Sequence, residues 1–523
     1  MPMTFLDGQQ NLSALSVPGV YVDIVPPQPF LTGAPTNMMG LVGVASWGPT
    51  NAPVAFSGPD SCAVNFGVPV IRKYDLASYV WASSQVGQAI GYYGVRVSDG
   101  TDVAASAAIQ TNCLTLTGKY TGSLGNSIKF QVVSGSAANS YMAIVSFPGR
   151  PPEQFNNITG SGNAFWVNLA AAINNGNGSR GPSKFVTAMA GAGTSAPTLA
   201  NLVTLTGGAD GATGVTDSTL VGQDSIPRKG MYALRRTGID GFALCDHSTS
   251  SAWAAIDSFA LSENCFFAAA TVSGDTIANA ISTRNSAGLD DYFTWLAVGD
   301  FPSFYDSQNG VTRQISPTAF MIGWAGNSSP ERSPLNKQLR GVVSTQTSQA
   351  QQTYSDAELA VAENGGVDLI VGPPTTPGGA YYTFITGRNA SSNTAANGIE
   401  WTRLTNYLAR SFEQKASGAI VGRLQSNRPD DRTRSDAKAL IDGFLASLKD
   451  PTVGSDGNGI IEDFGTVCDL MNNPLALQQR GFLFIYVAVK YLNVVRYFVI
   501  KLAGGGSVSV TSQSTPPQIS QFF

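Results

Sequence analysis

The chain has 523 residues, a formal net charge of −4 and charged side chains at only 13% of its positions. This length exceeds what one hydrophobic core serves, and it predicts roughly three domains. The acidic balance and the lack of a basic run argue against nucleic acid as a partner, because neutralising phosphates needs clustered Lys and Arg. So little charge predicts a surface covered by self-association, or else one built from Ser, Thr, Asn and Gly.

Membrane insertion and metal binding are also not expected. The longest apolar run, 482–489, is far shorter than the roughly 20 residues that a spanning helix needs. The first ten residues have neither the basic nor the hydrophobic region of a secretory signal. The five cysteines are scattered and never in CxxC spacing, which argues against disulfides and zinc. We expect no cofactor.

The N-terminal region predicts a strand in a loose tail, followed by an α/β unit. The tail strand lies in VPGVYVDIVPP, residues 17–27. A buried strand is predicted at Met39–Ala45 and ends in the loop that Gly48-Pro49 forces. Apolar residues at helical spacing then predict a helix over Tyr74–Tyr92, and the chain returns as a strand in YYGVRVSD, residues 92–99, through Val95 and Val97.

Residues 102–210 differ from the rest of the chain, with eight charged residues and many Thr, Ser, Gly and Asn. This composition predicts an inserted all-β domain. Its expected strands are Leu114–Leu116, Ser127–Val133 and Met142–Phe147, and its expected helix is Phe165–Asn175. The chain is expected to leave the insertion at Leu205–Gly211.

Beyond residue 211, short apolar strands alternate with helical patterns, which favours a parallel sheet. The strands are expected at 242–246, 265–271 and 292–299, and the helices at 250–262, at 276–287 and after Ser316-Pro317.

From about residue 344 the chain becomes more charged, and two amphipathic helices are predicted. One begins near Thr402, and the other has Ser435 as its N-cap. The apolar, strand-like run 481–502 follows and precedes a glycine-rich tail. A strand beyond the last compact element has unpaired backbone groups along its edge and needs a partner, for which a second copy of the chain is the simplest candidate.

Motifs for catalysis are weak. His247 is the only histidine and follows a predicted strand, with Asp246 and Ser248 beside it. Neighbours on a strand point to opposite faces, so a capping role is the preferred interpretation and an α/β enzyme with a site near His247 is the alternative. A glycine-rich stretch at 176–181 lacks the strand and helix of a dinucleotide site, and 456–464 lacks the alternating ligands of a calcium loop.

Several motifs resemble those of contractile phage tail sheath proteins. These are PGVYVDIVPP, the stretch MGLVGVASWGPTNAPVAFSG with its G-x-A-x-x-G-P turn, and the Phe66-Gly67 dipeptide. Two later segments, Ser316–Val343 and Thr353–Val371, are also similar to sheath segments, with Ala362 where the family has leucine. The resemblance covers most of the chain apart from 102–210.

The resemblance implies an α+β and α/β multidomain fold with a sheath core, an inserted domain and terminal arms. It divides the chain into an N-terminal arm (1–25), a middle α/β domain (26–101 and 211–343), an inserted β-rich outer domain (102–210), a C-terminal inner domain (344–503) and a C-terminal arm (504–523).

The implied function is structural, without enzyme activity. Copies would stack as hexameric rings around an inner tail tube, with baseplate and tail terminator proteins as further partners. The sheath would assemble in the host cytoplasm, remain in the virion and contract to drive the tube through the host envelope during genome delivery. A sheath of a phage-derived injection or secretion device is the alternative.

The resemblance also implies that the two arms add strands to the sheet of a neighbouring subunit. The expected arm residues are Val20, Tyr21, Val22, Ile24, Val508 and Val510, and the expected receiving residues, in strands 482–489 and 494–502, are Phe484, Tyr486, Val495, Tyr497 and Val499. The candidates for ion pairs to the tube or between copies are Arg410, Lys415, Arg428, Asp431, Arg432 and Lys438. For the charged run 428–436, a solvated loop that leads into a helix is an equal alternative, because exposed ion pairs contribute little.

Overall fold

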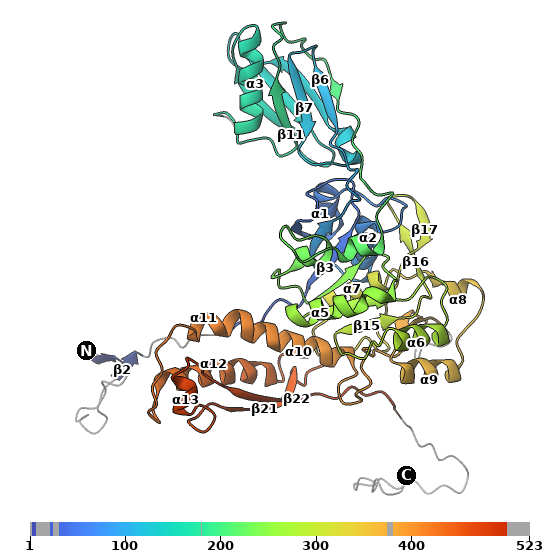
Figure 1. Ribbon diagram of the computed structural model, residues 1–523, viewed down its shortest axis with the longest axis vertical. Coiled ribbons are helices and arrows are strands. Elements are labelled where there is room, and N and C mark those ends of the chain that lie inside the picture. Colours follow the sequence, from blue (N-terminus) through green and yellow to red (C-terminus); the bar gives the residue numbers. More distant parts are fainter. Residues whose placement is uncertain are drawn as a thin grey trace, which may run out of the picture. The chain divides into compact units, whose positions relative to one another are not determined.

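The alternation of short apolar strands and helices produces one six-stranded sheet in the computed structural model of the chain (Figure 1). The structure describes residues 3–6, 21–24, 31–178, 180–373, 380–454 and 456–498. By contact the chain divides into Met1–Tyr491 and Leu492–Phe523. The described residues of the second unit, 492–498, contain no helix or strand.

The central sheet has the strand order β15-β14-β13-β3-β5-β4. Its strands are β3 (Met38–Gly43), β4 (Pro53–Ser57), β5 (Gly91–Arg96), β13 (Gly241–Leu244), β14 (Phe266–Ala270) and β15 (Thr294–Ala297). All neighbours are parallel except β4, which pairs antiparallel at one edge. Strands β13, β14 and β15 are buried along their whole length, as expected for a parallel sheet covered on both faces. The prediction of a parallel α/β sheet is confirmed.

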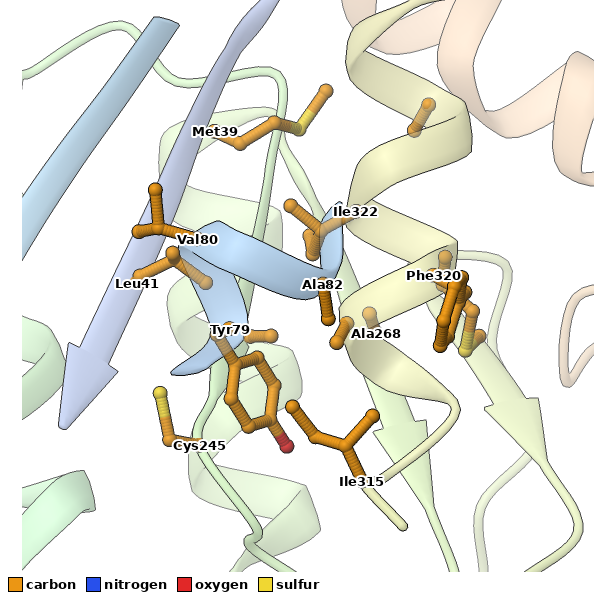
Figure 2. Close-up of a cluster of buried hydrophobic side chains, with 14 of the residues drawn as sticks. Met39, Leu41, Tyr79, Val80, Ala82, Cys245, Ala268, Ile315, Phe320 and Ile322 are labelled. Atoms are coloured by element: carbon orange, nitrogen blue, oxygen red, sulfur yellow. The ribbon is translucent and has the colours of Figure 1, made fainter. Parts of the chain in front are cut away.

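Two hydrophobic clusters cover the two faces of this sheet, because successive strand residues point to opposite sides. Met39 and Leu41 of β3 belong to one cluster, while Val42 belongs to the other. Helices α2 (Leu76–Val86) and α7 (Thr318–Gly326) pack in the first cluster, and Figure 2 shows Tyr79, Val80 and Ala82 beside Phe320 and Ile322. Helices α5 (Trp253–Glu263), α6 (Ile277–Ser286) and α9 (Asp356–Gly365) contribute to the second.

The helix predicted over Tyr74–Tyr92 is shorter in the structure. Helix α2 begins after Asp75, whose side chain accepts a hydrogen bond from the backbone N–H of Ser78, and it ends at Gly87. The following strand β5 begins at Gly91, one residue before the predicted strand YYGVRVSD. Glycine is a poor helix residue, so the boundary falls where its propensity predicts.

Residues 106–204 form two further sheets and one helix around their own core. The elements are β6 (Ser106–Ile109), β7 (Leu114–Gly118), β8 (Lys129–Ser134), β9 (Tyr141–Ser146), β10 (Glu153–Ile158), α3 (Asn163–Asn175), β11 (Val186–Ala190) and β12 (Val203–Thr204). One sheet has the order β10-β9-β8-β12 and the other β11-β7-β6. The strands and the helix predicted here are present, and the domain boundaries at 102 and 210 stay predictions.

The last part of the first unit is built on helices α10 (Ile399–Ser411) and α12 (Arg432–Lys449) and strands β21 (Ile461–Val467) and β22 (Tyr486–Tyr491). Leu404 and Leu408 of α10 share a core with Leu440, Phe444 and other predicted inward residues of α12. A π-helix, Phe412–Ala416, continues α10 into α11 (Ser417–Ile420).

The remaining elements are short. They are β1 (Met3–Leu6), β2 (Tyr21–Ile24), α1 (Gly58–Asn65), α4 (Asp217–Val221), β16 (Pro302–Asp306), β17 (Val311–Gln314), β18 (Ser344–Thr345), α8 (Gln346–Gln349), β19 (Ile370–Val371), β20 (Thr383–Phe384), α13 (Leu475–Gln478) and the 3-10 turns Ser123–Ser127, Gly230–Leu234 and Ser250–Ala252.

A buried ion-pair triad joins helix α10 to the central sheet. Asp240, directly before β13, accepts hydrogen bonds from the guanidinium groups of Arg403 and Arg410, and all three side chains are at most 1% exposed. The Arg403–Asp240 distance is 3.1 Å. Arg410 was expected to face a tube or a second copy, and this expectation is wrong, because its charge is used inside the chain.

Two acidic side chains, Asp257 in α5 and Asp291 before β15, are hydrogen bonded to each other. Burial, together with the charge of Asp291, raises the pKa of Asp257 to about 8. The hydroxyl of Thr294 donates to Asp257, and the backbone N–H groups of Phe293 and Thr294 donate to Asp291. The pair therefore shares a proton at neutral pH.

Because of this pair, we expect the free energy of unfolding to fall as the pH rises. The unfolded chain releases the Asp257 proton near pH 4, whereas the folded chain holds it until about pH 8, so each pH unit between these values costs up to about 1.4 kcal/mol. Asp257→Asn mimics the protonated form. At pH 9 its free energy of unfolding should be roughly 1 to 3 kcal/mol higher than that of the wild type. Urea unfolding at pH 5, 7 and 9 measures this. Asp290→Asn, at the adjacent exposed carboxyl, is the control and should keep the wild-type profile; a flat wild-type profile would contradict the prediction.

A candidate strand-accepting sheet

The C-terminal strands β21 and β22 form a two-stranded antiparallel sheet with open edges. Their register runs from Ile461 opposite Tyr491 to Val467 opposite Tyr486. Within the described part of the chain no third strand joins them. Each strand therefore has one edge with unpaired backbone N–H and C=O groups, which are the groups that pair with an added strand. A sheet of two strands is also marginal by itself.

Half-buried and exposed side chains alternate along β22, and the half-buried ones pack the sheet against helices α10 and α12. Val487, Val489 and Tyr491 are half-buried against the core that those helices share, while Tyr486, Ala488 and Lys490 are exposed. Burial raises the pKa of Tyr491, whose hydroxyl lies 3.1 Å from that of Thr405 on α10. One face of the sheet is thus fixed, and the other is accessible.

An apolar groove lies beside this sheet. It has a volume of about 450 Å³ and is lined by side chains of the α10–α11 end, of α12 and of the segment before β22, among them Phe412, Val421, Leu440, Phe482 and Ile485. Val421 is 80% exposed, and Leu424 close by in sequence is 92% exposed. Exposed apolar surface of this kind marks an interaction site more often than a free surface.

The predicted receiving residues are only partly in strands. Tyr486 opens β22 and is 70% exposed. Phe484 was expected in the same strand, but it precedes β22, because Asn473 hydrogen bonds both its backbone N–H, at 2.6 Å, and its C=O, at 2.9 Å. Val495 and Tyr497 were expected in a second strand, yet residues 492–498 form none and both side chains are more than 70% exposed. Val499 lies outside the described residues.

The expected N-terminal arm strand is partly described. Tyr21, Val22 and Ile24 lie in β2, which pairs in parallel with β1 in the register Met3 opposite Tyr21. Strand β1 was not predicted, although MTFL has the β-branched and aromatic residues of a strand. Val20 and the C-terminal residues Val508 and Val510 lie outside the described residues.

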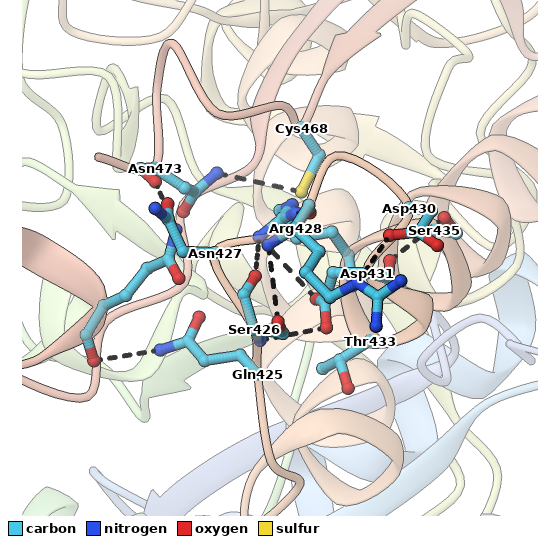
Figure 3. A network of polar contacts seen from close by, with 12 residues as sticks. Gln425, Ser426, Asn427, Arg428, Asp430, Asp431, Thr433, Ser435, Cys468 and Asn473 are labelled. Atoms are coloured by element: carbon cyan, nitrogen blue, oxygen red, sulfur yellow. Dashed lines mark hydrogen bonds and ion pairs between the residues drawn. The ribbon is translucent and has the colours of Figure 1, made fainter. Parts of the chain in front are cut away.

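Asp431 was expected in an ion pair between copies, but it is the N-cap of α12 (Figure 3). Its carboxylate accepts the backbone N–H groups of Ser426 and Arg434, each at 3.0 Å, and it is only 8% exposed. The prediction of Ser435 as the cap is wrong, because Ser435 lies one turn inside the helix and bonds the C=O of Asp431. Both residues are good cap formers, so the sequence did not decide between them.

Three of the expected charged residues remain accessible. Arg428 is 76% exposed and contacts Asp430 at 3.3 Å, and Arg432 is 72% exposed. Lys438 is 41% exposed and lies 2.5 Å from Asp442. These surface pairs contribute little to stability, so the charges are free to serve another role. The side chain of Lys415 is outside the described part of the structure.

The enzyme alternative finds no support around His247. The imidazole is 4% exposed, and neither ring nitrogen has a hydrogen-bond partner among the described residues. Burial lowers its pKa. Asp246 bonds the backbone N–H of Tyr74, and the Ser248 backbone donates to Asp217, so neither neighbour forms a relay with the ring. A Ser-His-Asp relay needs those hydrogen bonds.

Two further surveys of the described residues gave negative results. None of the helices there has the length and apolar character to cross a membrane. No group of three or more His, Cys, Asp or Glu side chains there is placed to hold a metal ion.

Comparison with solved structures identifies the fold. The chain is similar to the sheath tail protein of Listeria innocua (TM-score 0.58, 14% identity, 88% of this chain and 96% of that one). It is also similar to the sheath tail protein of Desulfitobacterium hafniense (TM-score 0.54, 15% identity, 86% and 93%). A third similar structure is the PVC sheath complex of an extracellular contractile injection system in its contracted state (TM-score 0.54, 10% identity, 94% and 99%). No protein-family model and no curated protein matches the sequence. The resemblance to sheath proteins is thus confirmed for the fold.

Proposed function

We propose that this chain is the structural protomer of a contractile sheath. The observation that carries the proposal is the extent of the structural likeness, which reaches 93 to 99% of three sheath chains. A shared fold does not by itself establish a shared function. The proposal therefore also rests on this chain's own surface, which has an open two-stranded sheet and an exposed apolar groove.

In this proposal the chain is a homo-oligomer whose copies stack as hexameric rings around an inner tube, between a baseplate and a tail terminator. Rotation of rigid domains into a more compact arrangement would drive the tube forward. The low charge of the chain supports polymerisation, because surface that is buried between copies is shielded from water and needs few charged side chains. The function requires no enzyme activity and no cofactor.

Strand addition would hold the copies together. The N-terminal arm, with Val20, Tyr21, Val22 and Ile24, and the C-terminal arm, with Val508 and Val510, would pair with the open edges of β21 and β22 in neighbouring copies. Main-chain hydrogen bonds then provide affinity, and the alternating side chains fix the register. Tyr486 would lie on the receiving strand. Val495, Tyr497 and Val499 would gain strand structure only when a neighbour pairs with them.

The contact between copies is heterologous in this proposal, since an arm on one copy meets a sheet on another. Such a contact generates a ring where the rotation between copies closes, and an open helical filament where it does not. Arg428, Arg432 and Lys438 would add ion pairs to the tube or to a neighbouring copy. Their exposure, given above, supports this role.

Two kinds of contractile device fit the proposal. In a phage tail the sheath would be part of the virion and would serve genome delivery. In a phage-derived injection device it would deliver a cargo other than a phage genome. The structural likeness to the PVC sheath supports this second candidate. Particles purified from the producing cells distinguish the two, because only the phage tail is attached to a DNA-filled capsid.

The decisive experiment is electron microscopy of the purified full-length protein. We expect hollow, striated tubes of constant diameter with sixfold symmetry in end view. A protein that stays monomeric at every concentration and ionic strength, and that also fails to polymerise on added inner tube, would overturn the proposal.

A further inference from the structure

Four cationic side chains of the inserted region line a pocket that this region forms together with residues 47–65. Residues 102–210 contain only five Lys and Arg residues, and four of them, Lys119, Arg150, Arg180 and Lys184, line a pocket of about 530 Å³. The fifth, Lys129, does not line it. In a chain that is acidic overall, the positive charge of this region is thus concentrated around one concave site.

Packed aromatic rings build the pocket and hold its cation-bearing segments in place. The ring of Trp47, after β3, meets Tyr120 edge to face, with 5.5 Å between the centroids. Phe147, at the end of β9, stacks on Phe185 at 4.6 Å and also contacts Trp47. The segments carrying Lys119, Arg150 and Lys184 are each one to three residues from one of these rings, so the pocket exists before any ligand arrives.

A buried carboxylate positions one side of the pocket without neutralising it. Glu153 is 3% exposed, and it accepts hydrogen bonds from the Arg180 guanidinium at 2.8 Å and the Lys184 backbone N–H at 3.1 Å. Its charge is therefore balanced by Arg180. Among the described residues, Lys119, Arg150 and Lys184 form no ion pair with a carboxylate, and Arg150 and Lys184 are exposed. The pocket thus has three cations available for a ligand.

The lining favours a ring-shaped, acidic ligand with hydroxyl groups. Aromatic faces carry partial negative charge and attract the C–H faces of sugar rings. Lys and Arg bind carboxylates, with Arg suited to bidentate contact. Helix α1 contributes Val64 and Asn65, which are at its C-terminal end. That end presents carbonyl groups, which can accept hydrogen bonds from the hydroxyl groups of a saccharide.

The shape of the site argues for a small ligand instead of a second copy of the chain. A pocket of about 530 Å³ is in the range of small-molecule sites, which are roughly 300–1,000 Å³. Contacts between proteins are broader surfaces, of about 800 Å² on each partner. We infer that this pocket binds an acidic saccharide, with its sugar rings over Tyr120 and Phe185 and its carboxylates paired with Arg150, Lys184 and Lys119.

Calorimetry on the full-length protein tests the inference with four probes: an oligogalacturonate of six rings, a neutral glucose oligomer of the same length, inorganic phosphate and an acidic hexapeptide. We expect the acidic saccharide to bind at least about tenfold more tightly than each of the other three, and its affinity to fall as salt is raised. Arg150→Gln/Lys184→Gln should weaken its binding at least about tenfold. Lys129→Gln, which removes the insertion's remaining cation, is the matched control and should leave binding unchanged.

Each alternative outcome overturns the inference. Absence of binding by the acidic saccharide means that the pocket is not its site. Equal binding of the neutral oligomer would show that the cations contribute nothing to the affinity. Equal binding of phosphate would show that the aromatic rings contribute nothing. Tighter binding of the hexapeptide indicates a protein partner such as a second copy. Equal loss in Lys129→Gln indicates nonspecific attraction by charge. Circular dichroism of each variant checks that the fold is retained.

Discussion

Replacing Asp240 by Asn is expected to lower the free energy of unfolding by about 3–5 kcal/mol. Asp240 is fully buried between Arg403 and Arg410, and Asn keeps its size while removing its charge. Burial already lowers the pKa of Arg403, so its positive charge is held there chiefly by Asp240. Two buried guanidinium groups without a counter-charge are among the most costly defects that a single substitution creates.

The hydrogen bonds of the two arginines explain why the chain cannot relax around this defect. Arg403 donates to the carbonyl groups of Ala325 at 2.8 Å and Ser328 at 2.9 Å, at the end of helix α7. Arg410 donates to the carbonyl groups of Ile239 at 3.0 Å and Asn264 at 2.8 Å. These contacts keep both side chains inside when Asp240 is lost, so the charge remains uncompensated.

Asp224 offers a matched control on the surface. It also bridges two arginines, Arg228 at 3.0 Å and Arg235 at 2.6 Å, but its side chain is 43% exposed. Water and salt screen such a pair, and Asp224→Asn should leave the unfolding curve unchanged. Urea denaturation of the unassembled protein, followed by tryptophan fluorescence, compares the two variants with wild type. Equal curves for Asp240→Asn and Asp224→Asn would show that the buried triad contributes no stability.

The triad also shows what the sequence was able to predict. The strands of the central sheet were predictable because runs such as FALC and FFAAA are apolar without interruption, which only a strand buried on both faces requires. The inward faces of α10 and α12 followed from their helical spacing. These patterns are local, so a single sequence contains them.

The position of Arg410 was not predictable, because its partner Asp240 is 170 residues away in the sequence. A charged residue near the end of an amphipathic helix is usually at the surface, and only the three-dimensional contact shows otherwise. The same limit applies to Phe484, where the side chain of Asn473 ends the strand. The pocket around Arg150 was missed for a related reason: its cations come from three separate loops, and no motif in the sequence joins them.

Removal of residues 1–25 is expected to abolish tube formation and to leave the folded protomer intact. The chain is fixed from Leu31 onward, where the Leu31 side chain is 3% exposed in the core shared by α10 and α12. The backbone N–H of Ala34 also donates to the hydroxyl of Ser411 at 2.9 Å. The deletion should therefore change the unfolding free energy by less than about 0.5 kcal/mol.

The loss of tubes would follow from the loss of a strand donor. Among the described residues, strand β2 pairs with β1 alone, and a two-stranded sheet of four-residue strands is too small to be stable by itself. Its stable state is expected to be in a neighbour's sheet, beside β21 or β22. Deletion of residues 1–7 is the matched control, because it removes β1 and keeps Tyr21–Ile24; this variant should still form tubes.

A single substitution tests the same strand without shortening the chain. Val22→Pro removes one backbone N–H from the middle of β2 and blocks the hydrogen bonding of an added strand. It should reduce polymerisation strongly, whereas Val22→Thr, which keeps the N–H and the β-branched shape, should not. Negative-stain microscopy and sedimentation of all four variants measure the outcome. Tubes formed by the 1–25 deletion, or equal polymerisation of the Pro and Thr variants, would mean that copies join through surfaces other than this arm, and the exposed groove beside β22 would then be the first surface to test.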